Sequence, residues 1–216
     1  MKWPAGVVLV AIAAAASIGV ADAQQGGGGG GGAPAYVAPK PDPSLAPAGM
    51  YAVDKNHASV TAKIARQNLA NFTFRFDKFD ASFAYDPAKP EAAQVQVTLD
   101  PTSINANVPA WTNRLQQPDM LNTAKFTDIK FVSTSFKRTG PTKGVLSGNV
   151  TFLGVTKPMT LDVTLNGVGP ARQTTVVGFS ATTSIKCSDF GLGGPIQMLH
   201  LSDDVTFDVE AEFQKM

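Results

Sequence analysis

His57 is the residue whose neighbours most suggest catalysis, because Asp54 and Ser59 stand close to it in the sequence. An aspartate, a histidine and a serine form a hydrolytic triad when the histidine can take the proton of the serine hydroxyl. The chain has no G-x-S-x-G nucleophile elbow, however, and Asp54 and His57 precede a predicted strand, where loop hydrogen bonds are common. We therefore interpret His57 as a structural histidine and predict no catalytic residue and no enzymatic activity.

The other residues that bind metals or phosphates in proteins are scattered. His200 and the single cysteine, Cys187, stand far from His57, and this spacing matches no metal site, so we predict neither a metal nor another cofactor. The glycines of Gly26–Gly32 lack the preceding strand and following helix of a phosphate-binding loop. Cys187 cannot form an intrachain disulfide; we expect a buried, inert thiol, with a reactive thiol or an intermolecular disulfide as the alternatives.

Strands must position these side chains, because apolar and polar residues alternate with a period of two through most of the chain. The eight candidate strands are HASVTAKI, FTFRFDKFDASF, QVQVTLD, IKFVSTSF, GVLSGNVTF, KPMTLDVTL, TVVGFSATTSI and DDVTFDVEAEF. Two other stretches, ARQNLAN and PAWTNRLQQPDMLNT, are typical of short helices or ordered loops. In the second stretch, Leu115 and Leu121 are expected to face the mouth of a barrel.

Eight one-sided strands with few helices favour an all-β fold, either a closed antiparallel barrel or a sandwich. Closure is favoured because it removes the exposed edges of long strands. Turns are expected at Asn166-Gly167 and Lys143-Gly144, and the stretch Gly154–Pro158 is expected to join two strands as a hairpin. The prediction is therefore an extended eight-stranded antiparallel barrel with one or two short helices.

The chain of 216 residues divides into three parts by composition. Residues 1–23 combine one lysine, an apolar run and the small-residue end Ala21-Asp22-Ala23, which predicts a cleaved secretory signal peptide and an exported protein. Residues 24–49 are rich in glycine, proline and alanine and are predicted to be a disordered tether. Residues 50–216 form the predicted folded domain. A net charge of +1 without a basic cluster argues against nucleic-acid binding.

The stretch LSGNVTFLGVTKPMTLDV resembles G-x-L-T-[IL]-x-G-V-T-[KR]-P-V-x-L, a signature of the YceI-like family. YAVDKNHASVTAKI resembles the opening Y-x-[IV]-D-x-x-H-[SA]-x-V of that family. Three further blocks follow in the family's order, and the similarity covers residues 51 to 213. They are FDKFDASFAYDPAKPEAAQVQVTLDPTSIN, DMLNTAKFTDIKFVSTSF, and GFSATTSIKCSDFGLG with the final DDVTFDVEAEF.

The resemblance implies a lipocalin-like barrel of the bacterial periplasm that binds a long-chain isoprenoid lipid, such as a polyprenyl quinone, without catalysis. It is compatible with transient membrane contact, since the same tail can remain in a bilayer, and it leaves the oligomeric state open. The chain departs from the family pattern at Arg66, at Trp111 and Arg114 within WTNRL, and at Cys187. These departures bear on the head-group preference more than on the fold.

The candidate lipid-binding residues of the barrel interior are the apolar members of the alternating sets. Phe72 is expected at one end of the barrel and Phe213 at its bottom. Two alternatives make different demands on the interior: an enzyme needs polar groups there, and a solid-core protein-interaction or stress-response module needs close packing. A cavity of several hundred Å³ favours a ligand. The candidates are Phe74, Phe76, Val97, Leu99, Phe131, Val150, Phe152, Leu161, Val163, Phe179, Phe207 and Val209.

Overall fold

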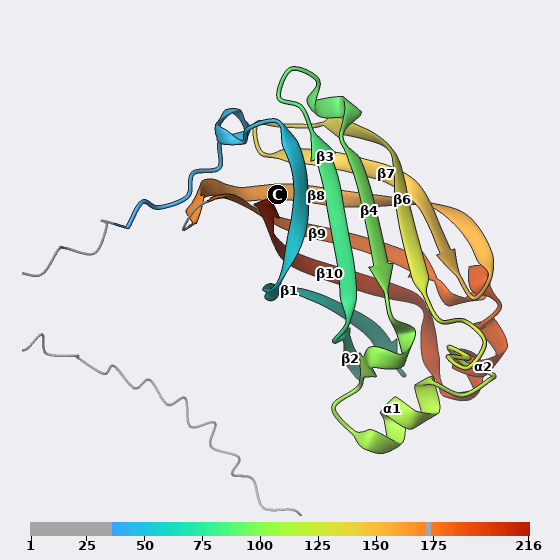
Figure 1. The fold of residues 1–216 in the computed structure, drawn as a ribbon. Coiled ribbons are helices and arrows are strands. Elements are labelled where there is room, and N and C mark those ends of the chain that lie inside the picture. Colours follow the sequence, from blue (N-terminus) through green and yellow to red (C-terminus); the bar gives the residue numbers. More distant parts are fainter. Residues whose placement is uncertain (1–35, 172–173) are drawn as a thin grey trace, which may run out of the picture. The chain divides into compact units, whose positions relative to one another are not determined.

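The computed structural model describes residues 36–171 and 174–216 (Figure 1), so the predicted signal peptide and residues 24–35 of the predicted tether lie outside the described residues. Within these described residues, two α-helices, α1 (Pro109–Leu115) and α2 (Gly193–Met198), accompany the strands. The same residues include four short 3-10 helices, η1 (Pro43–Leu45), η2 (Pro90–Ala92), η3 (Pro101–Ser103) and η4 (Cys187–Phe190). The strands are β1 (Gly49–Arg66), β2 (Ala70–Phe76), β3 (Phe79–Tyr85), β4 (Gln94–Leu99), β5 (Ile104–Asn105), β6 (Ile129–Arg138), β7 (Lys143–Phe152), β8 (Val155–Ala171), β9 (Thr174–Lys186) and β10 (Leu201–Lys215).

Eight of the described strands close into an antiparallel barrel. Their order around the barrel is β1, β3, β4, β6, β7, β8, β9 and β10, and the pairing of β10 with β1 completes the ring. The short strand β5 pairs with β2, and β2 pairs with the second half of β1, so these two strands extend the sheet beyond the ring. The all-β prediction of an eight-stranded lipocalin-like barrel with short helices is confirmed.

The stretch expected as one strand from Phe72 to Phe83 is two strands, β2 and β3. Its break lies at Asp77 and Lys78, because their amides donate to the Ser103 carbonyl oxygen at 3.1 Å and to its Oγ at 2.9 Å. Both strands still pair with the long strand β1, which has a register shift between Val53 and Ala58. β1 pairs with β3 through its first half and with β2 through its second half, while β10 pairs with both halves on the other side.

Three expected turns differ from the structure. Lys143-Gly144 is not a turn but begins strand β7. Asn166-Gly167 is not a turn but lies within β8, where the register against β9 shifts between Leu165 and Gly167. The hairpin between β7 and β8 turns at Leu153 and Gly154, whose φ angles of 50° and 76° fit a tight two-residue turn. The rest of the stretch predicted as hairpin connection, from Val155 onward, already belongs to β8.

The two stretches expected to be short helices or ordered loops have different structures. Within ARQNLAN, residues 67–69 form the loop between β1 and β2, with Gln67 and Asn68 at positive φ, and the flanking residues are strand ends, so the stretch is not a helix. PAWTNRLQQPDMLNT contains α1 as expected. Helix α2 has no counterpart among the expected elements, because GGPIQM offers neither a helical apolar period nor a capping side chain.

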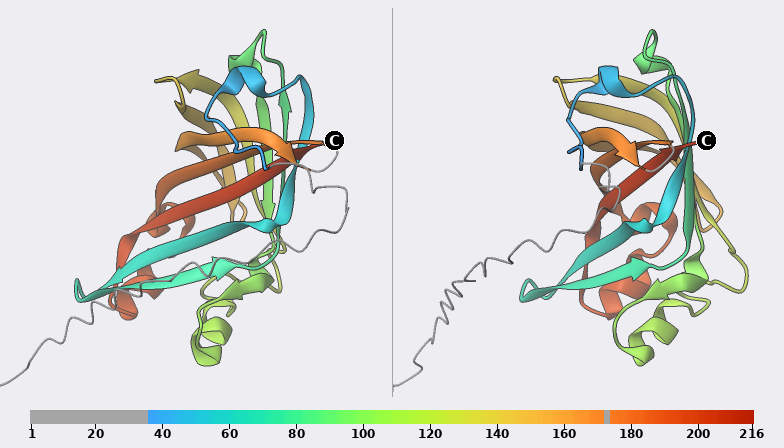
Figure 2. Two further views of the ribbon diagram at one scale, coloured as in Figure 1. Left: turned by 90° about the vertical axis from the view of Figure 1, so that its left-hand side faces the viewer. Right: turned by 60° about the vertical axis from the view of Figure 1, so that its left-hand side comes forward.

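The last part of the predicted tether, from Lys40 onward, packs on the barrel. We call residues 40–48 the strap; it includes η1 and runs beside β8 (Figure 2). Backbone hydrogen bonds join Lys40 and Val168 in both directions, at 3.0 and 2.7 Å. Ala46 is buried, and the Tyr51 hydroxyl donates to the Pro47 carbonyl oxygen at 2.7 Å. The strap is thus ordered by backbone pairing that its proline-rich composition does not reveal.

Among the described residues, no helix combines the length and the apolar character needed to cross a membrane.

Candidate ligand-binding cavity

A cavity of about 360 Å³ lies inside the barrel. At one end it is lined by the strap and by the connection between β6 and β7, and at the other by α1 and α2 (Figure 1). Its volume lies in the range of small-molecule sites. The interior of this barrel is therefore partly vacant, which is the condition that separates a ligand-binding barrel from a solid one.

All of the candidate interior residues predicted from the alternation line this cavity, although their contact with a lipid stays a prediction. Leu161 and Val163 illustrate the cause: they point inward along β8, while Thr160 and Asp162, which alternate with them, are exposed on the outside. The two inward side chains are only half-buried, because empty space inside the barrel leaves part of their surface uncovered. The residues are Phe74, Phe76, Val97, Leu99, Phe131, Val150, Phe152, Leu161, Val163, Phe179, Phe207 and Val209.

An aromatic cluster packs beneath the strap. The rings of Tyr51 and Phe83 stack with centroids 4.7 Å apart, and Phe83 meets Phe213 edge to face at 5.1 Å. Phe179 completes the cluster at 5.8 Å from Phe83. Burial raises the pKa of the Tyr51 hydroxyl, which keeps this group a neutral donor to the strap. Phe213 therefore lies at the strap end of the barrel.

The opposite end is lined by residues from the two helices. Phe72 meets Trp111 of α1 edge to face at 5.0 Å, and Leu115 and Leu121 line the cavity as expected. Sequence reasoning missed Ile196 of α2, which is buried and also lines the cavity. No alternation marks it, because a helix of six residues is too short to show a period. Phe83 was missed too, although it belongs to the same alternating pattern as the candidates.

The positions that depart from the family pattern divide into two pairs. Trp111 and Cys187 line the cavity, whereas Arg66 and Arg114 do not. Arg114 instead makes two hydrogen bonds to the carboxylate of Asp119, at 2.7 and 2.6 Å. Cys187 is buried, as predicted, and burial raises its pKa to about 12, so the thiol stays protonated and unreactive. Two of the four departures thus change the shape of the interior.

Carboxylate and imidazole groups are missing from the cavity wall in the described part of the chain. The wall includes no aspartate, glutamate or histidine, and its charged side chains are Lys130, Arg138 and Lys143. General acid–base catalysis needs such groups within hydrogen-bond reach of a bound substrate. The rest of the wall is largely apolar, which suits the retention of an apolar molecule.

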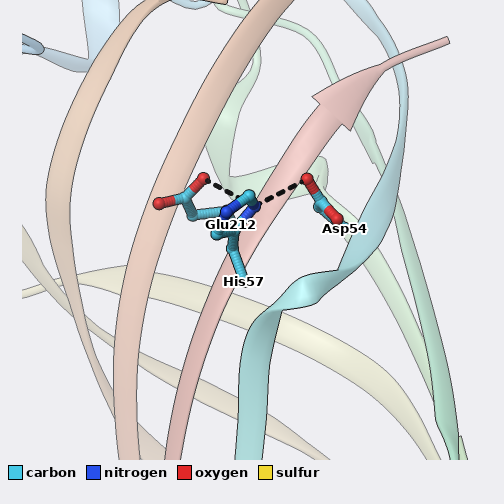
Figure 3. Close-up of side chains that lie close together, drawn as sticks. All are labelled: Asp54, His57 and Glu212. Atoms are coloured by element: carbon cyan, nitrogen blue, oxygen red, sulfur yellow. Dashed lines mark hydrogen bonds and ion pairs between the residues drawn. The ribbon is translucent and has the colours of Figure 1, made fainter.

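His57 lies outside the cavity, in a cluster with Asp54 and Glu212 (Figure 3). Its Nδ1 lies 2.9 Å from Asp54 Oδ2 and 3.9 Å from Glu212 Oε2. The Asp54 hydrogen bond, with the charges of both carboxylates, raises the pKa of His57. Asp54 also accepts from the Asn56 amide at 3.0 Å and from Gln214 Nε2 at 2.7 Å.

The cluster has a structural explanation. It lies at the register shift of β1 and joins this strand to β10, where the barrel closes. His57 is paired with carboxylates, and no hydrogen bond joins it to Ser59 among the described residues. Three ligand atoms within 4.8 Å of one another are close enough for a metal ion. The hydrogen bonds already made to Asp54 account for the cluster without one.

Similarity to known proteins agrees with this architecture. The YceI-like domain matches residues 51–213. A UPF0312 protein of Pseudomonas putida is 39% identical over 153 residues, which cover 69% of this chain and 80% of the relative. Burkholderia cenocepacia BcnA has a similar structure, with a TM-score of 0.65 and 25% identity, covering 74% of this chain and 98% of its own.

A polyisoprenoid binding domain from Saccharophagus degradans has the same fold, with a TM-score of 0.58 and 17% identity, covering 77% of this chain and 98% of its own. The domain match spans most of the chain, and it agrees with the sequence similarity to the Pseudomonas putida relative. The protein belongs to the YceI-like family.

Proposed function

We propose that this protein binds or carries a long-chain isoprenoid lipid inside its barrel, without catalysis, in the periplasm. The observation that carries the proposal is the vacant apolar cavity of about 360 Å³ enclosed by the eight strands. A hydrocarbon tail offers no hydrogen-bonding groups, so its recognition depends on removing apolar surface from water, at roughly 25 cal/mol per Å². A wall of phenylalanine, valine and leucine side chains suits such a tail.

Two further observations support the ligand class and the compartment. A domain of the same fold, from Saccharophagus degradans, is a polyisoprenoid binding domain. The apolar N-terminal run that ends in Ala21-Asp22-Ala23 has the composition of an export signal. The alternative of a solid-core interaction module requires a close-packed interior, and the cavity counts against it.

The direct test is to extract the purified full-length chain with organic solvent after expression in a bacterium that can export it. We expect mass spectrometry to find an isoprenoid lipid in the extract, and the extracted protein to take up an added polyprenyl quinone. Repeated extracts without lipid, together with no uptake of the quinone, would contradict the proposal.

A cavity-filling substitution separates a vacant barrel from a solid one. Leu161→Trp places a larger ring in the cavity, whereas Thr160→Trp places it on the exposed face of the same strand. We expect Leu161→Trp to abolish lipid uptake while leaving the free energy of unfolding within about 1 kcal/mol, since overpacking a solid core typically costs about 1–3 kcal/mol. Thr160→Trp should bind lipid like the wild type.

A further inference from the structure

The cavity meets the solvent at the hairpin between β6 and β7. Arg138, Pro141 and Lys143 of this hairpin line the cavity and are also exposed. Pro43 of the strap and Tyr85 at the end of β3 lie on the same rim, and the Tyr85 hydroxyl donates to the Pro43 carbonyl oxygen at 3.3 Å. We call these five residues the mouth; Figure 2 shows the strap and the β6–β7 hairpin at the same end of the barrel.

The mouth carries positive charge and no negative charge. Arg138 and Lys143 are cationic, and in residues 36–171 and 174–216 no carboxylate lies within ion-pair distance of either. The third cation of the cavity wall, Lys130, differs because its Nζ lies 3.1 Å from Asp128 Oδ2. Asp86 follows Tyr85 in the sequence but does not line the cavity. Two cations therefore stand at the opening of a hydrocarbon-lined space without an anionic partner in the described chain.

The hairpin holds these two side chains on a defined support. The guanidinium of Arg138 donates to the Pro141 carbonyl oxygen at 3.2 Å, across the turn. The Lys143 carbonyl oxygen accepts from the amides of Thr139 and Gly140 at 2.9 and 3.1 Å, which fixes the hairpin backbone. Guanidinium carries five N–H donors, and its side chain makes no second hydrogen bond within the described residues. The arrangement leaves donors of Arg138 to face a ligand.

We propose that the mouth binds the anionic head group, of the phosphate class, of an isoprenoid lipid whose tail fills the cavity; this inference rests on the proposed function. A guanidinium matches the geometry of phosphate oxygens, and an ammonium adds a second positive charge. The hydrocarbon tail can form neither an ion pair nor a hydrogen bond with these two cations. Arg138 and Lys143 thus make the barrel selective for a phosphorylated isoprenoid over the corresponding neutral alcohol.

The test compares geranylgeranyl phosphate with geranylgeraniol, two probes with the same tail. We expect the full-length wild-type protein to bind the phosphate at least tenfold more tightly, and this preference to shrink as the salt concentration rises, because salt screens exposed charges. The double variant Arg138→Gln, Lys143→Gln should bind both probes equally. The matched control is Lys137→Gln, since Lys137 lies beside Arg138 on β6, is exposed and does not line the cavity.

Each outcome bears on a different statement. Unchanged binding of geranylgeraniol by the double variant shows that its barrel is folded. Equal affinity of the wild type for both probes, or a preference that survives in the double variant, would overturn the head-group proposal while leaving the proposed function intact. Binding of neither probe would instead count against the proposed function. Displacement of geranylgeranyl phosphate by an equal concentration of inorganic phosphate would show that the mouth binds the free anion. That result would overturn the proposal that the bound phosphate group belongs to a lipid.

Discussion

At the scale of single residues, His57, interpreted from the sequence as a structural histidine, is an ion-pairing group outside the cavity. Its contacts with Asp54 and Glu212 raise its pKa above the ordinary value of 6.5. The contacts also lower the pKa of Asp54 below 3.8. The pair of His57 and Asp54 therefore stabilises the fold most at pH values between 3.8 and 6.5, where both groups are charged. Its contribution is lost at higher pH as His57 loses its proton, and at lower pH as Asp54 gains one.

We predict that His57→Gln reduces stability at pH 5.5 and has a smaller effect at pH 9, because the wild-type histidine loses its proton as the pH rises. The measurement is the urea midpoint of both proteins across this pH range, with the difference between them reporting His57. A difference that stays constant or grows with pH would contradict the ion-pair explanation. The double variant with Asp54→Asn provides the control, because the pH dependence due to this pair should shrink in its presence.

Residue types alone predict the cavity wall well and the His57 cluster poorly, for a physical reason. Alternation along one strand decides which side chains point inward, so Phe74, Leu161 and Phe207 are identified without knowledge of the neighbouring strands. The pairing of His57 with Glu212 depends on the closure of β1 against β10, more than 150 residues apart in the chain. No local pattern reports such a contact.

At the scale of elements, the approach of β6 to β7 depends on a glycine. A Cβ atom at Gly148 would lie 2.4 Å from the Val132 carbonyl oxygen and 2.5 Å from the ring of Phe131, which lines the cavity. Such a contact forces the ring further into the barrel or separates the two strands. Gly178 of β9 differs, because its nearest neighbour would be the Asn166 Cβ at 3.9 Å.

We predict that Gly148→Ala lowers the free energy of unfolding by about 1–3 kcal/mol, the usual cost of overpacking, and weakens the binding of an isoprenoid probe. Gly178→Ala, the matched control in a strand with open space, should change the stability by less than about 0.5 kcal/mol. Urea denaturation and geranylgeraniol titration of both variants check this. Equal stability of the two variants would show that β6 and β7 do not approach as closely as the structure has them.

Elements differ in how far the sequence determines them. The long strands follow from period-two alternation, which is strong over eight or more residues, as in β8 and β10. The strap does not follow, because proline-rich composition is compatible with both a disordered tether and an extended segment. Its order arises from pairing of Lys40 with Val168, a partner far along the chain.

At the scale of the whole molecule, closure of the barrel and its vacancy are separate properties with separate causes. The number and length of the strands favour closure, since eight strands in a ring leave no exposed edge. The vacancy depends on the summed volumes of inward side chains from all strands and on the two helices that cover one end. The sequence therefore predicts the ring, whereas the size of the cavity requires the three-dimensional structure.

A vacant barrel that accepts a lipid must become more stable when the lipid binds, because the ligand stabilises the folded state alone. At a free probe concentration one hundred times its dissociation constant, the gain is about 2.7 kcal/mol. For a domain of this size, each kcal/mol raises the melting temperature by about 2–4 °C, so geranylgeraniol should raise it by roughly 5–11 °C. Scanning calorimetry measures this shift directly.

Two variants test whether the thermal shift comes from lipid bound inside the barrel. Leu161→Trp occupies the cavity and should lose the shift, whereas Thr160→Trp, on the outer face of the same strand, should keep it. A shift that persists in Leu161→Trp would place the lipid on the outer surface. The same shift should survive substitution of both Arg138 and Lys143 by glutamine when the probe is the neutral alcohol, because hydrocarbon burial in the barrel, and not charge at the mouth, then supplies the binding energy.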